Sequence, residues 1–215
     1  MAIYEKDIDM LKENLIHLPK HLDGKACVLE LKEANYNWRQ MEWWSFYFEY
    51  KAKILLASHF SFPGNRYGRV SFDLKGSINW DLKAKAIKSD SHSIILNDKS
   101  AMEQSVEEFG YHGEIILLCD VEYNDNDRSF QQWHTELKGG KSKYEKAREA
   151  RTSVSRYRKT QAELADIVIL IFNATDLDLL ATHRQGRNSN GKSRRPKYEL
   201  DLEKIDDFEH YVIKR

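Results

Sequence analysis

Two apolar runs constrain the fold of this chain more than any other feature of its sequence. Residues 114–121 (EIILLCDV) and 166–172 (DIVILIF) carry little charge, so each predicts a buried strand of a β-sheet. Helical patterns alternate with these strands at residues 3–17, 37–56, 99–109 and 141–165, and residues 26–31 suggest a further short strand. The sequence therefore predicts an α/β or α+β fold, with a central mixed β-sheet flanked by helices.

Length and composition fit one folded domain. The chain has 215 residues and no repeat or low-complexity linker, so we expect a single domain over residues 1–215. Cys27 and Cys119 lie far apart in apolar contexts, which is typical of buried free thiols in a reducing compartment. The first residues lack the pattern of a signal peptide, and no apolar run approaches the roughly 18–20 residues of a membrane span. We expect a soluble protein of the cytoplasm.

Residues 70–85 (VSFDLKGSINWDLKAK) predict a β-hairpin between these elements. Apolar and polar residues alternate in both arms, so each arm buries one face. The two apolar sets share a side of the sheet only if even-numbered residues lie beside even-numbered ones. A three-residue loop satisfies this condition, for example one with Gly76 in a left-handed conformation, whereas a two-residue turn does not.

This pairing places Asp73, Asp81 and Lys83 together on the polar face of the hairpin. Asp73 then lies opposite Asp81 or Asn79, with Cβ atoms roughly 4.5–8 Å apart. Two carboxylates at that distance repel each other, and Mg²⁺ would relieve the repulsion. Lys83 could orient or deprotonate a water, or neutralise charge in a transition state. The alternative is an ordinary solvated strand face in which nearby lysines neutralise the acids.

Asp73, followed by Asp81-Leu82-Lys83 on the next strand, resembles the PD-(D/E)-x-K signature of a nuclease superfamily. The pattern is most similar to that of the compact type II restriction endonucleases. The resemblance implies a catalytic core of about residues 37–172 and Mg²⁺-dependent hydrolysis of phosphodiester bonds in specific double-stranded DNA sequences. It also implies a homodimer on a palindromic site.

Nucleases of this kind often carry a supporting acidic residue on a helix upstream of the hairpin. Residues 37–56 would form that helix, with Glu49 or Glu42 as the acid. The sequence departs from the family pattern in two ways: Phe72 replaces the proline before the first Asp, and the eight-residue interval to Asp81 is short.

A rival site exists further along the chain. Glu136-Leu137-Lys138 is also an E-x-K sequence, and it follows Asp120 and Glu122 at the end of a predicted strand. Against this alternative, residues 131–138 lack a clear strand pattern.

Two basic tracts point to a polyanionic partner, although the formal net charge of the chain is zero. Residues 138–159 hold nine Lys/Arg against two Glu, and residues 184–197 hold six Lys/Arg and no acid. A helix over residues 141–165 would gather Arg148, Arg151, Arg158 and Lys159 on one side. We expect DNA contacts from Arg39, Lys138, Lys141, Lys143, Arg148, Arg151, Arg156, Arg158, Lys159, Arg187, Asn188, Asn190, Arg194 and Arg195.

Three functions remain open at this point. The leading hypothesis is a restriction-type endonuclease in which Asp73 and Asp81 hold Mg²⁺, Lys83 acts beside the water, and Glu49 or Glu42 supports the site. The alternatives are a repair or junction-cleaving nuclease with the same core, and a non-catalytic DNA-binding protein.

Overall fold

The computed structural model describes residues 2–63, 72–88, 91–141, 143–150, 158–187, 191 and 193–215, without the side chains of residues 144, 148 and 149. The α-helices are α1 (Glu5–Leu15), α2 (Gly24–Glu33), α3 (Trp43–Leu56), α4 (Lys99–Phe109), α5 (Ser129–Leu137), α6 (Lys143–Glu149) and α7 (Ala174–Leu179). The strands are β1 (His21–Asp23), β2 (Leu74–Lys75), β3 (Asn79–Ala86), β4 (Ser93–Asp98), β5 (His112–Glu122), β6 (Gln161–Phe172), β7 (Ala181–His183), β8 (Lys197–Asp201) and β9 (Glu209–Lys214). A 3₁₀ helix, η1, spans Leu202–Asp207.

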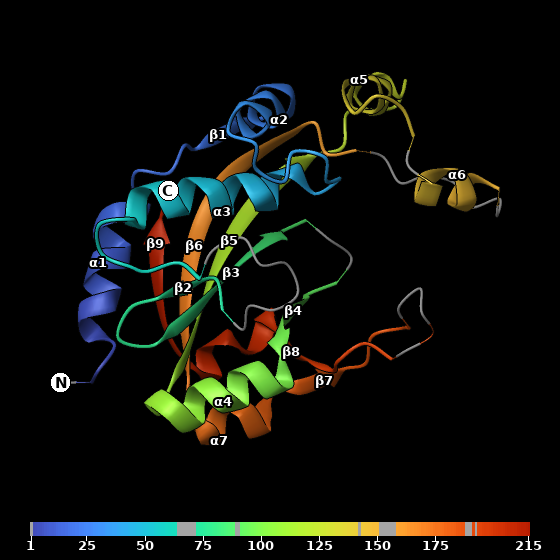
Figure 1. The fold of residues 1–215 in the computed structure, drawn as a ribbon. Helices are drawn as coiled ribbons and strands as arrows, with labels where there is room; N and C mark the ends of the chain where they lie inside the picture. The colour runs from blue at the N-terminus through green and yellow to red at the C-terminus, as the bar shows by residue number, and fades with distance from the viewer. Residues whose placement is uncertain are drawn as a thin grey trace.

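A mixed sheet with the order β1-β6-β5-β3-β2 forms the centre of the molecule, and β9 also pairs with β6 (Figure 1). β3 and β5 are parallel, while the other pairs in this sheet are antiparallel. The chain passes through β4 and α4 between β3 and β5, which is the kind of crossover that parallel strands require. A smaller sheet has the order β4-β8-β7. The predicted class, a mixed sheet flanked by helices, is confirmed.

Both faces of the central sheet are covered by apolar side chains. On β6, Ile167 and Ile169 belong to a core shared with α1, α2 and α3. Val168 and Leu170, on the opposite face, belong to a second core shared with α4, α7 and the smaller sheet. This two-sided burial explains why residues 166–172 are apolar at nearly every position, and the predicted strands at 114–121 and 166–172 are both confirmed.

The β2–β3 hairpin has the three-residue loop that the alternating pattern required. Lys75 pairs with Asn79, so Gly76, Ser77 and Ile78 form the loop. The expected left-handed Gly76 is wrong, because its φ is not positive. Gly76 is instead required by close packing, since a Cβ at this position would lie 2.5 Å from Oδ2 of Asp7 in α1.

Three predictions about local structure are wrong. Residues 26–31 belong to helix α2, whose N-terminus is capped by the Asp23 side chain and whose buried Cys27, Val28 and Leu31 share one face. The helix predicted at 37–56 begins only at Trp43. The helix predicted at 141–165 is wrong from residue 158 onward, because residues 158–160 are not helical and β6 begins at Gln161.

Other predictions agree with the structure. Helix α4 ends at Gly110, which adopts the left-handed conformation at φ 80°. Cys27 and Cys119 are buried free cysteines. Among the described residues, none of the helices has the length and apolar character needed to cross a membrane.

Candidate functional site

Three acidic residues lie in a row across neighbouring strands. The parallel register of β3 and β5 makes Asp81 and Glu114 direct partners. The antiparallel register of β2 and β3 pairs Leu74 with Trp80, so Asp73, the residue before β2, lies beside the segment of β3 that holds Asp81. Asp73 also donates its backbone N–H to the Trp80 carbonyl at 3.0 Å. The hairpin therefore brings Asp73 and Asp81 together as the sequence predicted, and β5 adds a third acid.

Lys83 bridges two of these acids. Its ammonium nitrogen lies 3.6 Å from Oδ1 of Asp81 and 3.6 Å from Oε2 of Glu114. Asp81 and Glu114 are 4% and 0% exposed, so the Lys83 charge is compensated inside the protein rather than by solvent. Burial alone would lower the pKa of Lys83, but Asp81 and Glu114 outweigh it and raise that pKa above its ordinary value.

His112 and Asn97 contact the same two carboxylates through their other oxygens. Nε2 of His112 lies 3.3 Å from Oδ2 of Asp81 and 3.7 Å from Oε1 of Glu114. Asn97, on β4, donates its side-chain amide to Oδ2 of Asp81 at 2.5 Å and its backbone N–H to Oε1 of Glu114 at 3.2 Å. The cluster therefore comes from β3, β4, β5 and the residue before β2, and Asp81 stands at its centre. Its members are Asp73, Asp81, Lys83, Asn97, His112 and Glu114.

The charges in this cluster shift the pKa values of its members. Burial raises the pKa of Asp73, and the neighbouring Asp81 charge raises it further. Burial also opposes ionisation of Asp81, yet Lys83 above all, with His112 and Asn97, holds the pKa of Asp81 below its ordinary value. Burial by itself would lower the pKa of His112, but Asp81 and Glu114 raise it to about 9. Asp73 is thus the acid with the least compensated charge.

Asp73 accepts a hydrogen bond from β3, and a residue of α3 affects its pKa. Its Oδ2 accepts a hydrogen bond from the Leu82 N–H at 2.9 Å. Glu49 on α3 is close enough for its charge to contribute to the raised pKa of Asp73. Oε1 of Glu49 accepts hydrogen bonds from Tyr36 at 2.5 Å and from Lys53 at 2.7 Å.

The other predicted acid on this segment, Glu42, contacts different groups. It is the N-cap residue of α3, and its Oε2 accepts hydrogen bonds from Lys159 and, at 3.0 Å, from the Trp44 indole. Of the two candidates, the structure therefore places Glu49 beside the cluster.

Sequence reasoning missed Asn97, His112 and Glu114. His112 and Glu114 are two residues apart at the start of β5, in phase with Ile116. Polar residues in phase with the buried positions of an apolar strand are the signal that could have marked them. Asn97 had no such signal, because it reaches the cluster only through the packing of β4 over β3.

The rival residues do not form a comparable cluster. Glu136 lies on helix α5 and accepts a hydrogen bond from Gln132, while Lys138 contacts Glu145 at 3.1 Å. Asp120 pairs with Lys88. Among the described residues, no hydrogen bond or ion pair joins Glu136 or Lys138 to Asp120 or Glu122.

Several cations of the first basic tract make contacts within the protein. Lys138 and Arg158 both approach Glu145, Lys159 pairs with Glu42, and Arg39 donates to the Lys138 carbonyl at 3.3 Å. Arg158 is only 5% exposed. The prediction that one helix gathers Arg158 and Lys159 on the same side as Arg148 and Arg151 is wrong for Arg158 and Lys159, because neither residue is helical.

The remaining predicted DNA contacts include five exposed cations. Lys141 and Lys143 lie at α6, and Arg187, Arg194 and Arg195 follow β7. Figure 1 shows α6 and the segment after β7 both projecting toward the right of the view. The predicted contacts at Arg151, Arg156, Asn188 and Asn190 fall outside the described residues, and so does the side chain of Arg148, a residue of α6.

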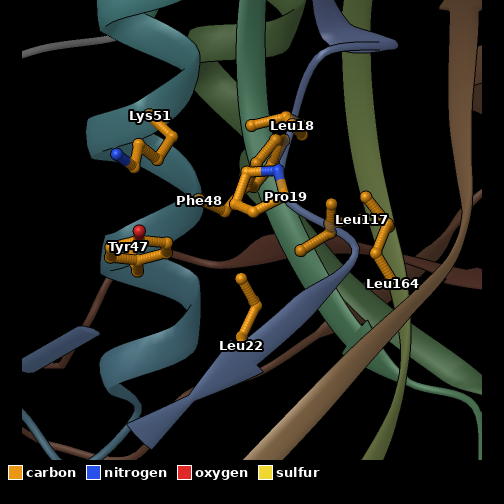
Figure 2. Close-up of a pocket in the computed structure, with 8 residues that line it drawn as sticks. All are labelled: Leu18, Pro19, Leu22, Tyr47, Phe48, Lys51, Leu117 and Leu164. Carbon is orange, nitrogen blue, oxygen red and sulfur yellow. The ribbon is translucent and has the colours of Figure 1, made fainter. Parts of the chain in front are cut away.

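A small cavity elsewhere has no comparable chemistry (Figure 2). It holds about 10 Å³, room for at most one water, between α3, β1 and the central sheet. Its polar side chains, Tyr47 and Lys51, bind Glu30 at 2.6 Å and 2.5 Å. Its lining consists of Leu18, Pro19, Leu22, Tyr47, Phe48, Lys51, Leu117 and Leu164. It is a gap in the packing of the core.

Comparisons of the chain with protein-family models, curated proteins and solved structures find no match. The function is therefore inferred from the residues of the cluster and their geometry.

Proposed function

We propose that the protein is a Mg²⁺-dependent endonuclease of the restriction type, which hydrolyses phosphodiester bonds in double-stranded DNA. The observation that carries this proposal is the closeness of Asp73 to Asp81, with Lys83 two residues after Asp81 on β3. The resemblance of these residues to the PD-(D/E)-x-K signature supports the same assignment.

Asp73 and Asp81 fit the needs of a Mg²⁺ ion. Both are carboxylates, the ligand type that Mg²⁺ prefers, and they are close enough for the Asp81 charge to raise the pKa of Asp73. The backbone N–H of Leu82 donates a hydrogen bond to Oδ2 of Asp73, while no described residue donates one to Oδ1 of Asp73. A Mg²⁺ ion held there would supply Lewis-acid charge to a phosphate. Glu49 is the further acid nearby.

Lys83 supplies positive charge in this proposal. Its two carboxylate neighbours keep the ammonium protonated, which is unsuitable for removing a proton from water. A protonated lysine beside a phosphate stabilises the negative charge that develops during phosphodiester hydrolysis. Of the roles open at the sequence level, charge neutralisation is therefore favoured over deprotonation.

The exposed cations of the two basic tracts support DNA as the substrate. Lys141 and Lys143 lie in one tract, and Arg187, Arg194 and Arg195 in the other. Contacts between such cations and DNA phosphates give affinity without reading the base sequence. A homodimer would place two equivalent active sites on a palindromic sequence.

The test is cleavage of supercoiled plasmid in the presence of Mg²⁺. We expect discrete fragments from the wild type, and rates lower by about 10²-fold or more in Asp73→Asn, Asp81→Asn and Lys83→Met. Asp166→Asn and Lys214→Met are the matched controls, because this ion pair joins β6 to β9, away from both candidate sites, and should not affect cleavage. Circular dichroism and DNA binding of each variant separate loss of chemistry from loss of folding.

Other outcomes would point to the alternatives. Wild-type protein that binds DNA but never cuts it, with any plasmid sequence and Mg²⁺ or Mn²⁺, would contradict the enzyme proposal and favour a non-catalytic DNA-binding protein. Cleavage lost in Glu136→Gln but retained in Asp81→Asn would move the site to the rival residues. Cleavage of branched but not linear duplexes would favour a junction-cleaving nuclease.

A further inference from the structure

Asp81, His112 and Glu114 form a closed set of potential metal ligands. One ligand atom from each residue lies within 4.8 Å of the others, and all three residues are buried. His112 and Glu114 have no exposed surface, and Asp81 is 4% exposed. Oδ2 of Asp81 and Oε1 of Glu114 face Nε2 of His112. The other oxygen of each carboxylate, Oδ1 of Asp81 and Oε2 of Glu114, faces Lys83.

Polar atoms in this set lack the hydrogen bonds that burial demands. Neither ring nitrogen of His112 makes a hydrogen bond to any residue that the structure describes, and Oε2 of Glu114 makes none either. At 3.3 Å and 3.7 Å, the contacts of Nε2 with the two carboxylates do not meet hydrogen-bond geometry. A buried ring nitrogen without a partner is costly, and a cation bound to Nε2 of His112 would satisfy that atom, whereas Oε2 of Glu114 faces Lys83.

The spacing of the donors fits a tetrahedral ion. With bonds of about 2.1 Å, neighbouring ligand atoms of a tetrahedral zinc site lie about 3.4 Å apart. The separations of Nε2 from the two carboxylate oxygens, 3.3 Å and 3.7 Å, bracket that value. Asn97 donates hydrogen bonds to both oxygens that face Nε2, and such bonds orient the carboxylates of metal sites.

The donor types also discriminate between ions. Mg²⁺ prefers an octahedral set of oxygens, whereas imidazole nitrogen combined with two carboxylates suits Zn²⁺. We propose that Asp81, His112 and Glu114 bind one Zn²⁺ ion, with His112 coordinating through Nε2 and the fourth position left to a non-protein ligand. This site shares Asp81 with the proposed pair Asp73–Asp81 but takes its other two ligands from β5, and it does not depend on nuclease activity.

The test is titration of metal-free protein with Zn²⁺, followed by calorimetry, and with Co²⁺, whose visible absorption reports tetrahedral coordination. We expect one ion per chain for the wild type. We expect His112→Gln and Glu114→Gln to bind Zn²⁺ at least about tenfold more weakly than the wild type. Substitution of residues that only contact a metal ligand already lowers metal affinity by this factor, so loss of a ligand should lower it at least as much. His92→Gln, which removes an exposed histidine, is the matched control and should bind like the wild type.

Two further arms keep the result clear if a buried substitution disrupts folding. In wild-type protein labelled with ¹⁵N-histidine, Zn²⁺ should shift the Nε2 resonance of one histidine, and that resonance should be absent from His112→Gln. Asp73→Asn should retain Zn²⁺ binding while it loses Mg²⁺-dependent cleavage, so the two proposals can fail separately. The zinc proposal is overturned if the wild type takes up no stoichiometric Zn²⁺, or if Zn²⁺ shifts the Nε2 resonance of another histidine. In either case His112 would be a buried cation in an ion-pair network.

Discussion

Nζ of Lys83 lies 3.6 Å from Oε2 of Glu114, a carboxylate with no exposed surface, although the two residues are on different strands. Their strands are parallel neighbours, and Asp81, the direct partner of Glu114, is also an ion-pair partner of Lys83. A single lysine thus forms ion pairs with two buried acids, and its removal leaves His112 as the remaining cationic neighbour of both.

We expect Lys83→Met to destabilise the metal-free protein by about 3–5 kcal/mol, because it removes one partner of two buried ion pairs. Glu114→Gln should also destabilise the protein. The double variant should lose less free energy of unfolding than the sum of the two single losses, with a coupling energy of about 1–3 kcal/mol. Urea unfolding of the four proteins measures this cycle. The surface pair Lys88 and Asp120 provides the comparison cycle, for which we expect little coupling. Additive effects at Lys83 and Glu114 would contradict the ion pair.

The hairpin that carries Asp73 and Asp81 depends on a carboxylate from another element. Asp7 on α1 accepts hydrogen bonds from the Ser77 N–H at 2.8 Å, the Ser77 hydroxyl at 3.0 Å and the Trp80 indole at 3.0 Å. We expect Asp7→Ala to lower the free energy of unfolding by about 2–4 kcal/mol, because it leaves buried donors unsatisfied.

The neighbouring Asp9→Ala is the control for this prediction, since Asp9 is exposed on the same helix and should have little effect. Thermal or urea unfolding supplies the measurement. Equal effects of the two substitutions would show that Asp7 acts through the helix alone and not through the turn.

A third prediction concerns pH and the contact between α2 and α3. Burial would raise the pKa of Glu30, but Lys51 and Tyr47 outweigh it and lower that pKa. A carboxylate with a lowered pKa in the folded state stabilises the protein above its unfolded-state pKa, and this contribution disappears as the pH falls through the folded-state value. Glu30→Gln should therefore cost more stability at pH 7 than at pH 3.

The comparison is made by urea unfolding at both pH values, with Glu33→Gln as the exposed control at the end of the same helix. A penalty for Glu30→Gln that is the same at both pH values would be inconsistent with the stabilising role of the ionised carboxylate.

The fourth prediction concerns DNA binding. Lys143 and Arg187 are exposed, and each belongs to one of the two basic tracts. If each contacts one phosphate, the double variant Lys143→Ala/Arg187→Ala should reduce the slope of log K against log salt by about 2. Fluorescence anisotropy with a labelled duplex over a range of salt concentrations measures the slope.

Lys159→Ala is the control for this measurement, because Lys159 is ion-paired with Glu42 and its side chain is 13% exposed. We expect it to change the slope less than either single substitution in the exposed pair. A larger change for Lys159 would show that the DNA-binding surface lies nearer to the start of α3.

Local patterns predicted much of the fold correctly. The period of two in residues 70–85 determined the loop length and the common side of Asp73, Asp81 and Lys83, because alternate residues of a strand must face the same way. The uninterrupted apolar runs predicted β5 and most of β6. The helix predicted at 141–165 failed where β-pairing with β1 and β5 overrode the helical pattern of residues 161–165.

The sequence by itself determined which side chains the hairpin brings together, because strand geometry depends only on neighbours along the chain. Only the tertiary structure decided that Asp81 on this polar face is buried rather than solvated. The packing of β4 and β5 against β3 adds Asn97, His112 and Glu114, which lie 16, 31 and 33 residues beyond Asp81 in the sequence. Contacts across such distances arise from strand order and register, and these are set by the burial of the whole sheet rather than by any local pattern.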